Sequence, residues 1–353
     1  MKRVLYLSNI EVPYRTAFFN LLAKHCELTV VYERKRSANR DKNWTESVQR
    51  NYNVEYLGGL KVRNENGFSL KILKYISGKY DCVIVGCYNS PIQMFAITIM
   101  RLFKLQYILN VDGEVFLDGK GIKNRIKRFF LSGASKYLCA GERSAESLKV
   151  VANNKPIIPY YFSSLTAEEL IANGKNQGER NNTVLVVGQY FDYKGMDIAL
   201  EAARKNTDIK YKFVGMGKRT ELFLKENHAE NEKNIEFIPF LKKQDLESEY
   251  KKCAMLVLPS RQECWGLVIN EAASFGMPIV STWGSGAAVE FLADKYPQYL
   301  ALSDNADQLY QCIKRLMDDV EVKEYERYLI EKTKLYSIEK CVQAHLDACE
   351  IEG

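Results

Sequence analysis

Hydrophobic positions along the chain form short apolar runs of strand length, which alternate with segments whose apolar side chains recur at helical spacing. Arg3–Ser8, Leu28–Tyr32 and Cys82–Val85 are runs of the first kind. Arg15–Lys24 and Ile92–Phe103 are segments of the second kind. Because strands that alternate with helices build mostly parallel sheets, this pattern predicts an α/β fold.

The pattern stops once and then starts again. Thr166–Asn182 is polar and rich in Asn, Gly, Lys and Glu, and strand-like runs resume at Val184–Val187. A length of 353 residues also suits about two domains. We therefore expect a first Rossmann-like domain, a linker, a second Rossmann-like domain and a closing helix. The predicted bounds are 1–166, 167–182, 183–334 and 335–353.

The second half centres on a strand–loop–helix–strand unit that carries two glutamates. The strand Met255–Leu258 leads into a polar loop with Glu263, and the helix Leu267–Phe275 contains Glu271. Backbone amides at a helix N-terminus favour negative charge, so the amides from Cys264 to Leu267 suit a phosphate group. A carboxylate beside a diphosphate would be unfavourable, and Glu263 is therefore better suited to accepting hydrogen bonds from sugar hydroxyls.

Two further elements follow strands of the same predicted sheet. Gly215-Met216-Gly217 closes the strand Lys212–Val214, and Lys194-Gly195 lies in the loop after Val184–Val187. Alone, such patterns are more common in tight turns or on solvated surfaces. Together with the glutamate loop, they predict a site for a nucleoside diphosphate that is attached to a hydroxyl-rich group.

In the first half, Asp112-Gly113-Glu114 follows the strand Tyr107–Val111. Residues just past a strand's carboxyl end face the ligand crevice of an open α/β sheet, but Asp-Gly is also a common turn pair, and the sequence leaves both interpretations open. The polar and basic segment Arg34–Arg50 is predicted to be a long loop that borders a site. No G-x-G-x-x-G fingerprint follows the first strand, which disfavours NAD binding.

The charge balance is mildly basic. A net charge of +6 comes from 50 Lys and Arg against 44 Asp and Glu, which suits anionic small molecules or an anionic membrane surface, although solubility alone also accounts for it. Lys120–Leu131 joins basic and apolar residues at helical spacing. We expect its apolar face in the core and its basic side within reach of lipid phosphates. Nucleic-acid binding has little support, because the charge is modest and no aromatic-basic module is evident.

No apolar run approaches the roughly 20 residues that span a bilayer. The first strand begins at Arg3, so we expect no signal peptide. The nine cysteines are scattered without a C-x-x-C pair, which indicates reduced thiols in the cytosol. We therefore predict a cytoplasmic protein that can also work at the inner face of the cell membrane.

The run Glu263–Glu271 resembles the E-x7-E signature of the retaining glycosyltransferases of family four, which have the GT-B fold. Pro259-Ser260 before it and Gly276-Met277-Pro278 after it fit the same pattern. The Lys194-Gly195 loop and the Gly215–Gly217 turn resemble two further motifs of that family. The resemblance covers the second half of the chain through its motifs and the first half through its architecture.

The resemblance implies two Rossmann-like domains whose parallel sheets face each other across a cleft, with a C-terminal helix that crosses back to the first domain. The segments Asp112-Gly113 and Pro159–Leu165 resemble the corresponding segments of family members that build bacterial surface polysaccharides such as capsule and lipopolysaccharide. The implied activity is retaining transfer of a hexose from a nucleoside-diphosphate sugar, UDP-linked in most of the family, to a saccharide or lipid-linked saccharide acceptor. No cofactor and no metal are implied, and the sequence shows no Asp-x-Asp site or histidine cluster.

The same resemblance implies a role for each matched position. Glu263 would bind the donor sugar, Glu271 the nucleotide ribose, and Lys194 the diphosphate. The implied catalytic residues are Glu263, Lys194 and Asp112. The implied donor-binding residues are Glu271, Gln189, Gly215, Gly217, Cys264, Trp265, Gly266, Leu267 and Arg15.

Two positions depart from the family pattern. Gln189 stands where an arginine is common, which removes one positive charge from the diphosphate site, and Arg15 is a candidate replacement. Asp112 lies near the position of a family histidine, and the chain has only three histidines. Two alternative functions stay open: a non-catalytic nucleotide-sugar-binding or scaffold subunit, and a UDP-sugar epimerase of the same shape, against which the few histidines argue.

Overall fold

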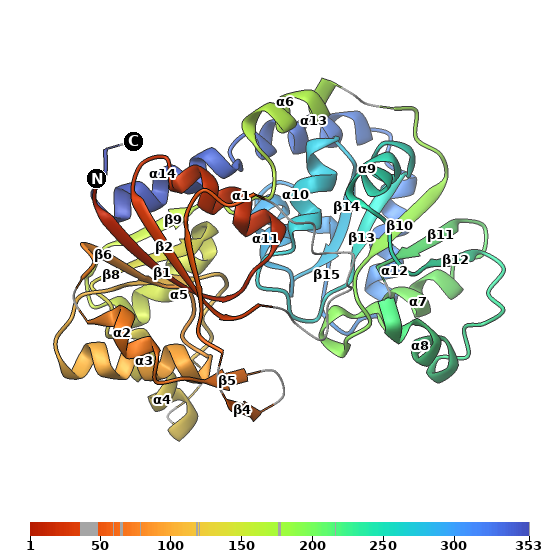
Figure 1. Ribbon diagram of the computed structural model, residues 1–353. Helices are drawn as coiled ribbons and strands as arrows, with labels where there is room; N and C mark the ends of the chain where they lie inside the picture. The colour runs from red at the N-terminus through yellow and green to blue at the C-terminus, as the bar shows by residue number, and fades with distance from the viewer. Residues whose placement is uncertain are drawn as a thin grey trace. The chain divides into compact units, whose positions relative to one another are not determined.

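The computed structural model describes residues 1–35, 49–58, 60–63, 66–77, 79–117, 119, 121–175, 178–215 and 217–352. Most of the predicted loop Arg34–Arg50 lies outside the described residues, as do Met216 and Lys120. The chain divides into two compact units (Figure 1). The first unit consists of Met1–Tyr161 and Ile338–Gly353, and the second of Phe162–Ser337.

The first unit is built on a seven-stranded sheet with the strand order β3-β2-β1-β6-β7-β8-β9. All neighbouring strands in it run parallel. The strands are β1 (Arg3–Ile10), β2 (Glu27–Arg34), β3 (Asn53–Tyr56), β6 (Cys82–Val85), β7 (Ile108–Val111), β8 (Lys136–Ala140) and β9 (Ile157–Tyr160). The helices are α1 (Pro13–Leu22), α2 (Ile72–Ile76), α3 (Pro91–Leu102), α4 (Ile122–Leu131), α5 (Gly141–Ala152) and α14 (Ile338–Ala348). An antiparallel ribbon of β4 (Leu60–Arg63) and β5 (Asn66–Phe68) was not predicted.

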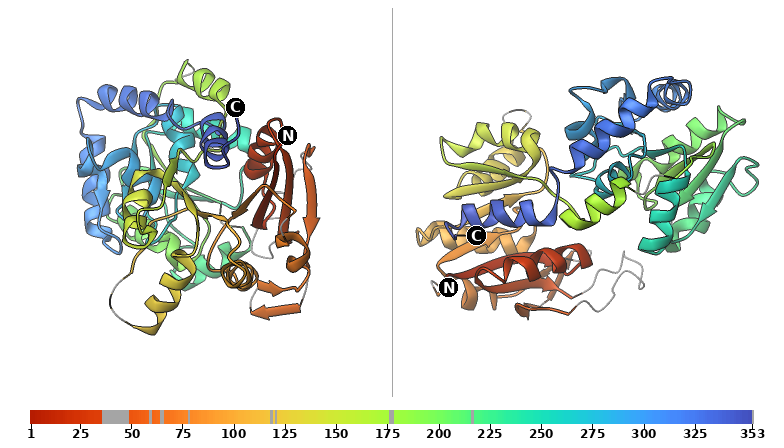
Figure 2. Two further views of the ribbon diagram at one scale, coloured as in Figure 1. Left: turned by 90° about the vertical axis from the view of Figure 1, so that its left-hand side faces the viewer. Right: turned by 90° about the horizontal axis from the view of Figure 1, so that it is seen from above.

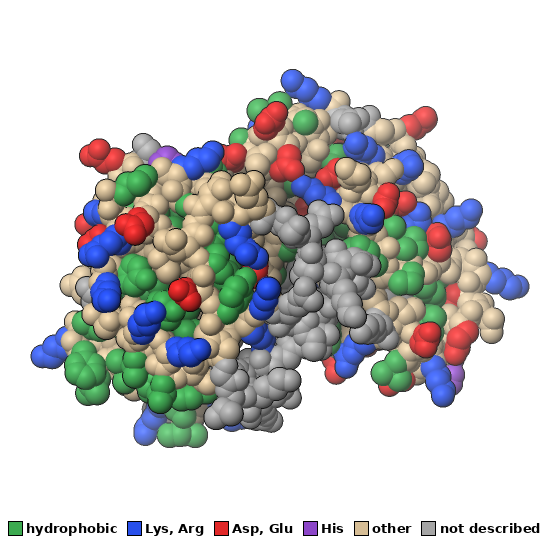
Figure 3. Space-filling model, in the orientation of Figure 1, with side chains coloured by type: hydrophobic (Ala, Val, Ile, Leu, Met, Phe, Trp, Pro, Cys, Tyr) green, Lys and Arg blue, Asp and Glu red, His purple; other side chains and the backbone are tan. Residues whose placement is uncertain are grey.

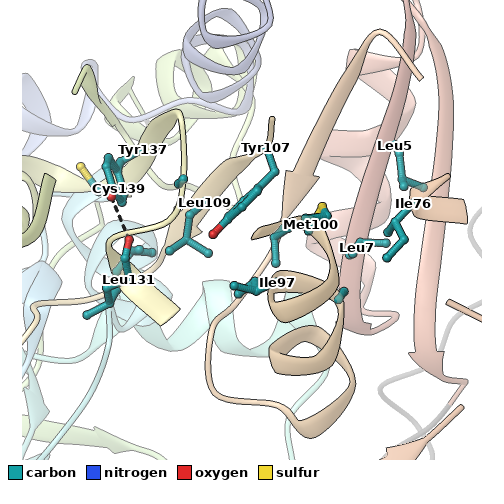
Figure 4. Close-up of a cluster of buried hydrophobic side chains, with 14 of the residues drawn as sticks. Leu5, Leu7, Ile76, Ile97, Met100, Tyr107, Leu109, Leu131, Tyr137 and Cys139 are labelled. Atoms are coloured by element: carbon teal, nitrogen blue, oxygen red, sulfur yellow. Dashed lines mark hydrogen bonds between the residues drawn. The ribbon is translucent and has the colours of Figure 1, made fainter. Parts of the chain in front are cut away.

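The core of the first unit lies where helices cover the sheet, and Figure 4 shows part of it. Leu5 and Leu7 of β1 and Leu109 of β7 are buried together with Ile97 and Met100 of α3. A central parallel strand is covered on both faces, which explains why β1 reads as a nearly continuous apolar run. Within this core the Tyr137 hydroxyl donates a hydrogen bond to the Leu131 carbonyl oxygen at 2.8 Å.

The C-terminal helix α14 belongs to the first unit, as the resemblance implied. It packs against α1 and β9, and it lies beside α1 in Figure 2. His345 of α14 contacts the rings of Tyr6, Phe18 and Tyr160. Its far end is held by Lys2, whose ammonium group donates to the Cys349 carbonyl oxygen at 3.1 Å. Residues from both ends of the chain therefore complete one core.

The second unit is built on a six-stranded parallel sheet with the order β12-β11-β10-β13-β14-β15. Its strands are β10 (Thr183–Val187), β11 (Lys210–Val214), β12 (Ile235–Ile238), β13 (Met255–Leu258), β14 (Ile279–Thr282) and β15 (Leu300–Ala301). Its helices are α6 (Ala167–Lys175), α7 (Met196–Arg204), α8 (Thr220–Glu226), α9 (Lys243–Lys252), α10 (Leu267–Ser274), α11 (Gly286–Leu292), α12 (Ala306–Met317) and α13 (Val322–Thr333). Short 3-10 turns are η2 (Asp192–Lys194), η3 (Gly217–Arg219) and η4 (Pro297–Tyr299).

The predicted linker over 167–182 is instead part of the second unit's fold. It contains helix α6, whose Leu170 is buried. After the helix, Arg180 pairs with the buried Glu326 at 3.2 Å, and the Asn181 amide donates to the Lys252 carbonyl oxygen at 2.7 Å. The segment resembles a linker in composition because its residues are mostly polar and α6 buries only Leu170.

Helix α4 also differs from its prediction, because its apolar face does not lie in the core. Ile122, Ile126 and Phe129 are exposed, and within α4 the buried residue is Leu131. Ile122, Ile126 and Phe129 share one helical face, and Leu131 lies on the opposite one, so seating Leu131 turns the apolar stripe outward. In the described part of the chain, no helix has the length and apolar character that crossing a membrane requires.

Candidate active site

The three sequence-predicted elements of the second unit lie at one edge of its sheet. Strands β11, β10 and β13 are neighbours in that order, and they run parallel. Each is followed directly by one of the predicted loops: Gly215–Gly217 after β11, Gly188–Gly195 after β10, and Pro259–Gly266 after β13. The carboxyl edge of a parallel sheet is where ligands bind in open α/β folds. The structure therefore brings these loops together where a ligand site is expected.

The Lys-Gly loop is packed directly on the glutamate loop. Gly195 has φ of +65°, and a Cβ placed there would overlap the Pro259 carbonyl oxygen. The Tyr193 carbonyl oxygen accepts hydrogen bonds from the amides of Arg261 at 2.9 Å and Gln262 at 3.1 Å. Only glycine combines this dihedral angle with this close approach. Gly195 therefore sets the position of Lys194 relative to the loop that contains Glu263.

Lys194 and Glu263 form an ion pair between Nζ and Oε2. Their side chains are 20% and 17% exposed, so a ligand can still reach both. The backbone of Glu263 is fixed on both sides, because its amide donates to Gly284 O at 2.8 Å and its carbonyl accepts from the Gly286 amide at 3.1 Å. An anion that bound Lys194 would release the Glu263 carboxylate to accept hydrogen bonds from hydroxyl groups.

The loop from Cys264 to Leu267 contains the amides that the sequence predicts to bind a phosphate group, and its tryptophan is buried. Trp265 is 3% exposed, and its indole Nε1 donates to Asn270 Oδ1 at 2.9 Å. The Trp265 carbonyl accepts from the Ala287 amide at 2.8 Å. Trp265 therefore anchors the loop. In a trans peptide the N–H points opposite to the C=O, so the amide of Gly266 points away from Ala287. The hydrogen bond from the Gly286 amide to the Glu263 carbonyl orients the amide of Cys264 in the same way.

The amides of Gly215 and Gly217 in the turn after β11 are used within the fold. The Gly215 amide donates to Ile238 O at 3.2 Å and the Gly217 amide to Pro239 O at 2.9 Å. A Cβ on Gly215 would lie 3.2 Å from the Gly188 carbonyl oxygen. The residue is small because two loops meet there. Gly215 and Gly217 can line a pocket, but their amides already serve the turn.

Glu271 lies in α10 with both carboxylate oxygens hydrogen-bonded. Ser164 Oγ donates to Oε1 at 3.0 Å, and the Tyr250 hydroxyl donates to Oε2 at 3.0 Å. Burial raises the pKa of Glu271, while both hydrogen bonds act against that rise. Glu263 and Glu271 therefore have separate partners, Lys194 for the first and Tyr250 with Ser164 for the second. Sequence reasoning did not find Tyr250 or Ser164, since a buried tyrosine in α9 looks like an ordinary core residue.

Arg219 is a third residue that the sequence did not reveal as part of the site. Gln189 follows β10 in the turn that was expected to lack a cation. The Arg219 guanidinium donates to the Tyr190 carbonyl oxygen at 3.0 Å and lies 4.6 Å from the centre of the Phe191 ring. Arg219 comes just after the Gly215–Gly217 turn, and the adjacency of β11 and β10 brings it to this place. A positive charge therefore lies beside the turn that contains Gln189.

The first unit has its own polar pocket at the carboxyl edge of its sheet. The pocket has a volume of about 110 Å³ and includes Arg15 and Asp112 in its lining. Arg15 Nη2 donates to Asp112 Oδ2 at 2.6 Å, and Arg15 Nη1 donates to the Tyr6 hydroxyl at 3.0 Å. The residues that complete the lining are Ser8, Asn9, Ile10, Val12, Tyr14, Gly86 and Cys87.

The Asp112 carboxylate accepts more hydrogen bonds than an Asp-Gly turn alone requires. Asn110 Nδ2 donates to Oδ1 at 2.6 Å, and the buried Tyr160 hydroxyl donates to the same oxygen. Asp112 and Arg15 form an ion pair in which their opposite charges neutralise each other. The sequence predicted separate roles for them, Arg15 as a phosphate contact and Asp112 as a substrate contact. Neither residue lies in the second unit, where the other predicted site residues are found.

The family model described as "Glycosyl transferases group 1" matches residues 168–335. An uncharacterized glycosyltransferase of Methanocaldococcus jannaschii is 30% identical over 247 residues, which is 67% of this chain and 66% of the relative. The O-antigen chain mannosyltransferase C of Escherichia coli is 26% identical over 143 residues, which is 39% of this chain and 38% of the relative. The matches therefore span less than two thirds of these relatives.

Solved structures agree with the fold along the whole chain. HepE of Anabaena, solved in complex with UDP, superposes with a TM-score of 0.70 at 12% identity and covers 99% of this chain and 100% of its own. At that identity the likeness concerns architecture, and it confirms the predicted pair of Rossmann-like halves. Residues 168–335 are therefore similar to the glycosyl transferases group 1 family, within a chain that has the GT-B fold.

Proposed function

We propose that this protein is a glycosyltransferase that moves a hexose from a nucleoside-diphosphate sugar, a UDP-sugar, to a hydroxyl group of a saccharide. The ion pair of Lys194 and Glu263 carries the proposal, because it places a cation and a carboxylate beside oriented amides at the carboxyl edge of the sheet. The group 1 domain match and the UDP complex of HepE support it. The resemblance to family four supports retention at the anomeric carbon.

On the donor, each group has a separate task. Lys194 and the amides of Cys264 and Gly266 would bind the diphosphate, which frees the Glu263 carboxylate for the hydroxyls of the sugar. Glu271, aimed by Tyr250 and Ser164, would accept hydrogen bonds from the ribose. Arg219 would supply the positive charge that Gln189 lacks.

In the reaction, the bond between the anomeric carbon and the diphosphate oxygen breaks, and a bond to the acceptor oxygen forms on the same face. Negative charge grows on the leaving diphosphate, and positioned cations and amides stabilise that charge most effectively. The leaving phosphate would take the acceptor's proton, so no separate base is needed. Lys194, Arg219 and the loop amides would supply this stabilisation, and we propose that no metal takes part.

The acceptor we propose is a lipid-linked saccharide of a bacterial surface polysaccharide. The O-antigen mannosyltransferase among the relatives supports this class. In the first unit, the pocket with Arg15 and Asp112 offers a donor and an acceptor of hydrogen bonds, which suits a hydroxyl-rich ligand. The pair would bind acceptor hydroxyls, and Asn110 and Tyr160 would keep Asp112 in place.

A panel of nucleotide-sugars tests the proposal in two steps. Thermal shift identifies the donor, since a ligand at about a hundredfold excess over its Kd stabilises the fold by roughly 2.7 kcal/mol. A transfer assay with that donor and a saccharide acceptor then follows the release of nucleoside diphosphate and the new glycoside. Binding without turnover would favour a scaffold subunit, and a changed sugar on the nucleotide would favour an epimerase. Absence of any shift across the panel contradicts the proposal.

A further inference from the structure

Helix α4 presents an apolar stripe to solvent instead of to the core. Ile122, Ile126 and Phe129 are spaced i, i+4 and i+7, so they lie on one helical face. They are 69%, 47% and 42% exposed. A contiguous exposed apolar surface on a protein indicates an interaction site.

Side chains from two other segments extend this stripe into a larger surface. Arg101, in the last turn of α3, donates to the Phe129 carbonyl oxygen at 2.6 Å and lies 4.2 Å from the centre of the Phe129 ring. Lys127 Nζ donates to the Phe116 carbonyl oxygen at 2.8 Å. These contacts join α4 to further exposed apolar residues. The surface, here called the α3–α4 patch, consists of Leu102, Phe103, Phe116, Ile122, Ile126 and Phe129.

The charged side chains of α4 are all positive. At about 100° per residue, Lys123 and Arg125 lie on opposite sides of the α4 stripe. Helix α4 also carries Lys127 and Arg128, and its sequence IKNRIKRFFL contains no acidic residue. Figure 3 shows hydrophobic side chains with Lys and Arg around them over the region of α3 and α4, at the lower left of the view. An apolar stripe between cations matches the boundary between anionic headgroups and acyl chains.

We propose that the α3–α4 patch docks on the surface of an anionic bilayer. Ile122, Ile126 and Phe129 enter the acyl boundary, while Lys123 and Arg125 bind lipid phosphates. With ten residues, α4 lies in the plane of the surface and is too short to span it. A second copy of the chain is a poorer occupant, because it would bring the same cations face to face. The docking itself does not depend on the proposed function. Only its biological purpose does, since a lipid-linked acceptor would lie in the same bilayer.

Vesicle flotation of the full chain tests this docking. The protein is mixed with vesicles of phosphatidylcholine and phosphatidylglycerol, or of phosphatidylcholine alone. We expect binding to the anionic vesicles that weakens with salt. The variant Ile122→Gln/Ile126→Gln/Phe129→Gln should lose at least about tenfold in affinity, and Lys123→Gln/Arg125→Gln about fivefold for each charge removed. The matched control Val150→Gln/Ile171→Gln/Leu222→Gln changes three residues that are also exposed and should bind like the wild type.

Two outcomes overturn the inference. One is wild-type protein that does not float with anionic vesicles at low salt, and the other is an α4 stripe variant that floats as well as the wild type. Self-association that depends on the patch, measured by analytical ultracentrifugation without vesicle binding, would assign the surface to a second copy instead. Donor binding by thermal shift is measured on the same samples. It checks that each variant is folded, and it separates a failure of docking from a failure of the proposed transferase activity.

Discussion

Tyr250 donates a hydrogen bond from its hydroxyl to Glu271 Oε2 at 3.0 Å, although the tyrosine is 1% exposed and looks like a core residue. The bond links α9 to α10, and Ser164 holds the other carboxylate oxygen from the segment before α6. Burial raises the pKa of Glu271, and the hydrogen bonds from Ser164 and Tyr250 lower it. Tyr250 therefore both aims the carboxylate and favours its ionised form.

Tyr250→Phe should weaken donor binding and leave the chemical step nearly intact. A hydrogen bond to a charged group contributes about 1.5–3 kcal/mol, so we expect KM for the nucleotide-sugar to rise roughly tenfold or more with little change in kcat. Without this bond the pKa of Glu271 rises further. When the pH is lowered, Glu271 is therefore protonated at a higher pH than in the wild type, and donor binding is lost there. The acid limb of the pH profile of kcat/KM should therefore move to higher pH.

Tyr211→Phe is the matched control for that experiment. Tyr211 in β11 is as buried as Tyr250, and its hydroxyl is not a partner of Glu271 in the hydrogen bonds of the site. The control should leave KM and the acid limb unchanged. Ser164→Ala removes the other hydrogen bond and should act in the same direction as Tyr250→Phe. If the acid limb of the pH profile stays in place in both site variants, Tyr250 and Ser164 contribute only packing and do not affect the ionisation of Glu271.

Lys194→Ala should reduce turnover far more than donor binding. Loss of one positioned group that stabilises the leaving charge typically costs about 100- to 1,000-fold in kcat. Lys314→Ala, an exposed lysine of α12, controls for the loss of a charge elsewhere. Single-turnover kinetics with saturating donor measure the chemical step directly. Wild-type turnover in the Lys194 variant would remove this residue from the mechanism.

Arg219→Gln tests whether this arginine replaces the charge that Gln189 lacks. We expect KM for the donor to rise about threefold to tenfold, because an exposed cation contributes about 1 kcal/mol to binding a phosphate. The reciprocal change Gln189→Arg should restore most of the affinity in the double variant. If Arg219→Gln binds donor normally, the contacts of Arg219 with Tyr190 and Phe191 serve the turn alone.

The sequence predicted the continuous apolar strand β13 and the periodic helices α7 and α12, because their apolar spacing is set locally. It missed α6 and the role of Tyr250, because both depend on partners that are distant in sequence. Leu170 is the buried residue of α6, and Tyr250 meets Glu271 only after α9 and α10 have packed.

The orientation of α4 could not be predicted for the same reason. Both a core-facing and a solvent-facing stripe fit its pattern, and tertiary packing decides between them by burying Leu131. In the site, the loops' positions followed from strand ends, since parallel strands place their carboxyl ends on one edge. The hydrogen-bond partners of the Gly215 and Gly217 amides did not follow, because they come from β12 and the residue after it.

Gly195→Ala should be far more damaging than Gly217→Ala, although both glycines have positive φ. The new methyl group at Gly195 would overlap the Pro259 carbonyl oxygen, whereas a Cβ at Gly217 meets no atom within 4 Å. We expect Gly217→Ala to cost about 1–2 kcal/mol of stability for the dihedral angle alone. Gly195→Ala should cost several kcal/mol or displace the Lys194 loop. Chemical denaturation measures the difference, and equal losses would contradict the close contact between the loops.

His345 should make the stability of the protein fall as the pH drops below neutrality. The imidazole is buried among Tyr6, Phe18 and Tyr160, and its Nδ1–H donates to the Cys341 carbonyl oxygen at 2.7 Å. Burial lowers the pKa of His345 from its usual 6.5 to about 4. Between these values the unfolded chain takes up a proton that the folded chain does not, so the contribution of His345 is fully present above pH 6.5 and is lost as the pH falls toward 4.

His345→Gln separates this effect from the titration of other groups. Between about pH 7 and pH 5, the wild type should lose about 2 kcal/mol more unfolding free energy than the variant does. His25→Gln removes a histidine outside the ring cluster and should retain the wild-type pH dependence, because it leaves His345 in place. Urea denaturation at both pH values provides the four free energies for each comparison. If the unfolding free energies of wild type and His345→Gln depend on pH in the same way, this histidine is already solvated in the folded protein, which would contradict its burial in α14.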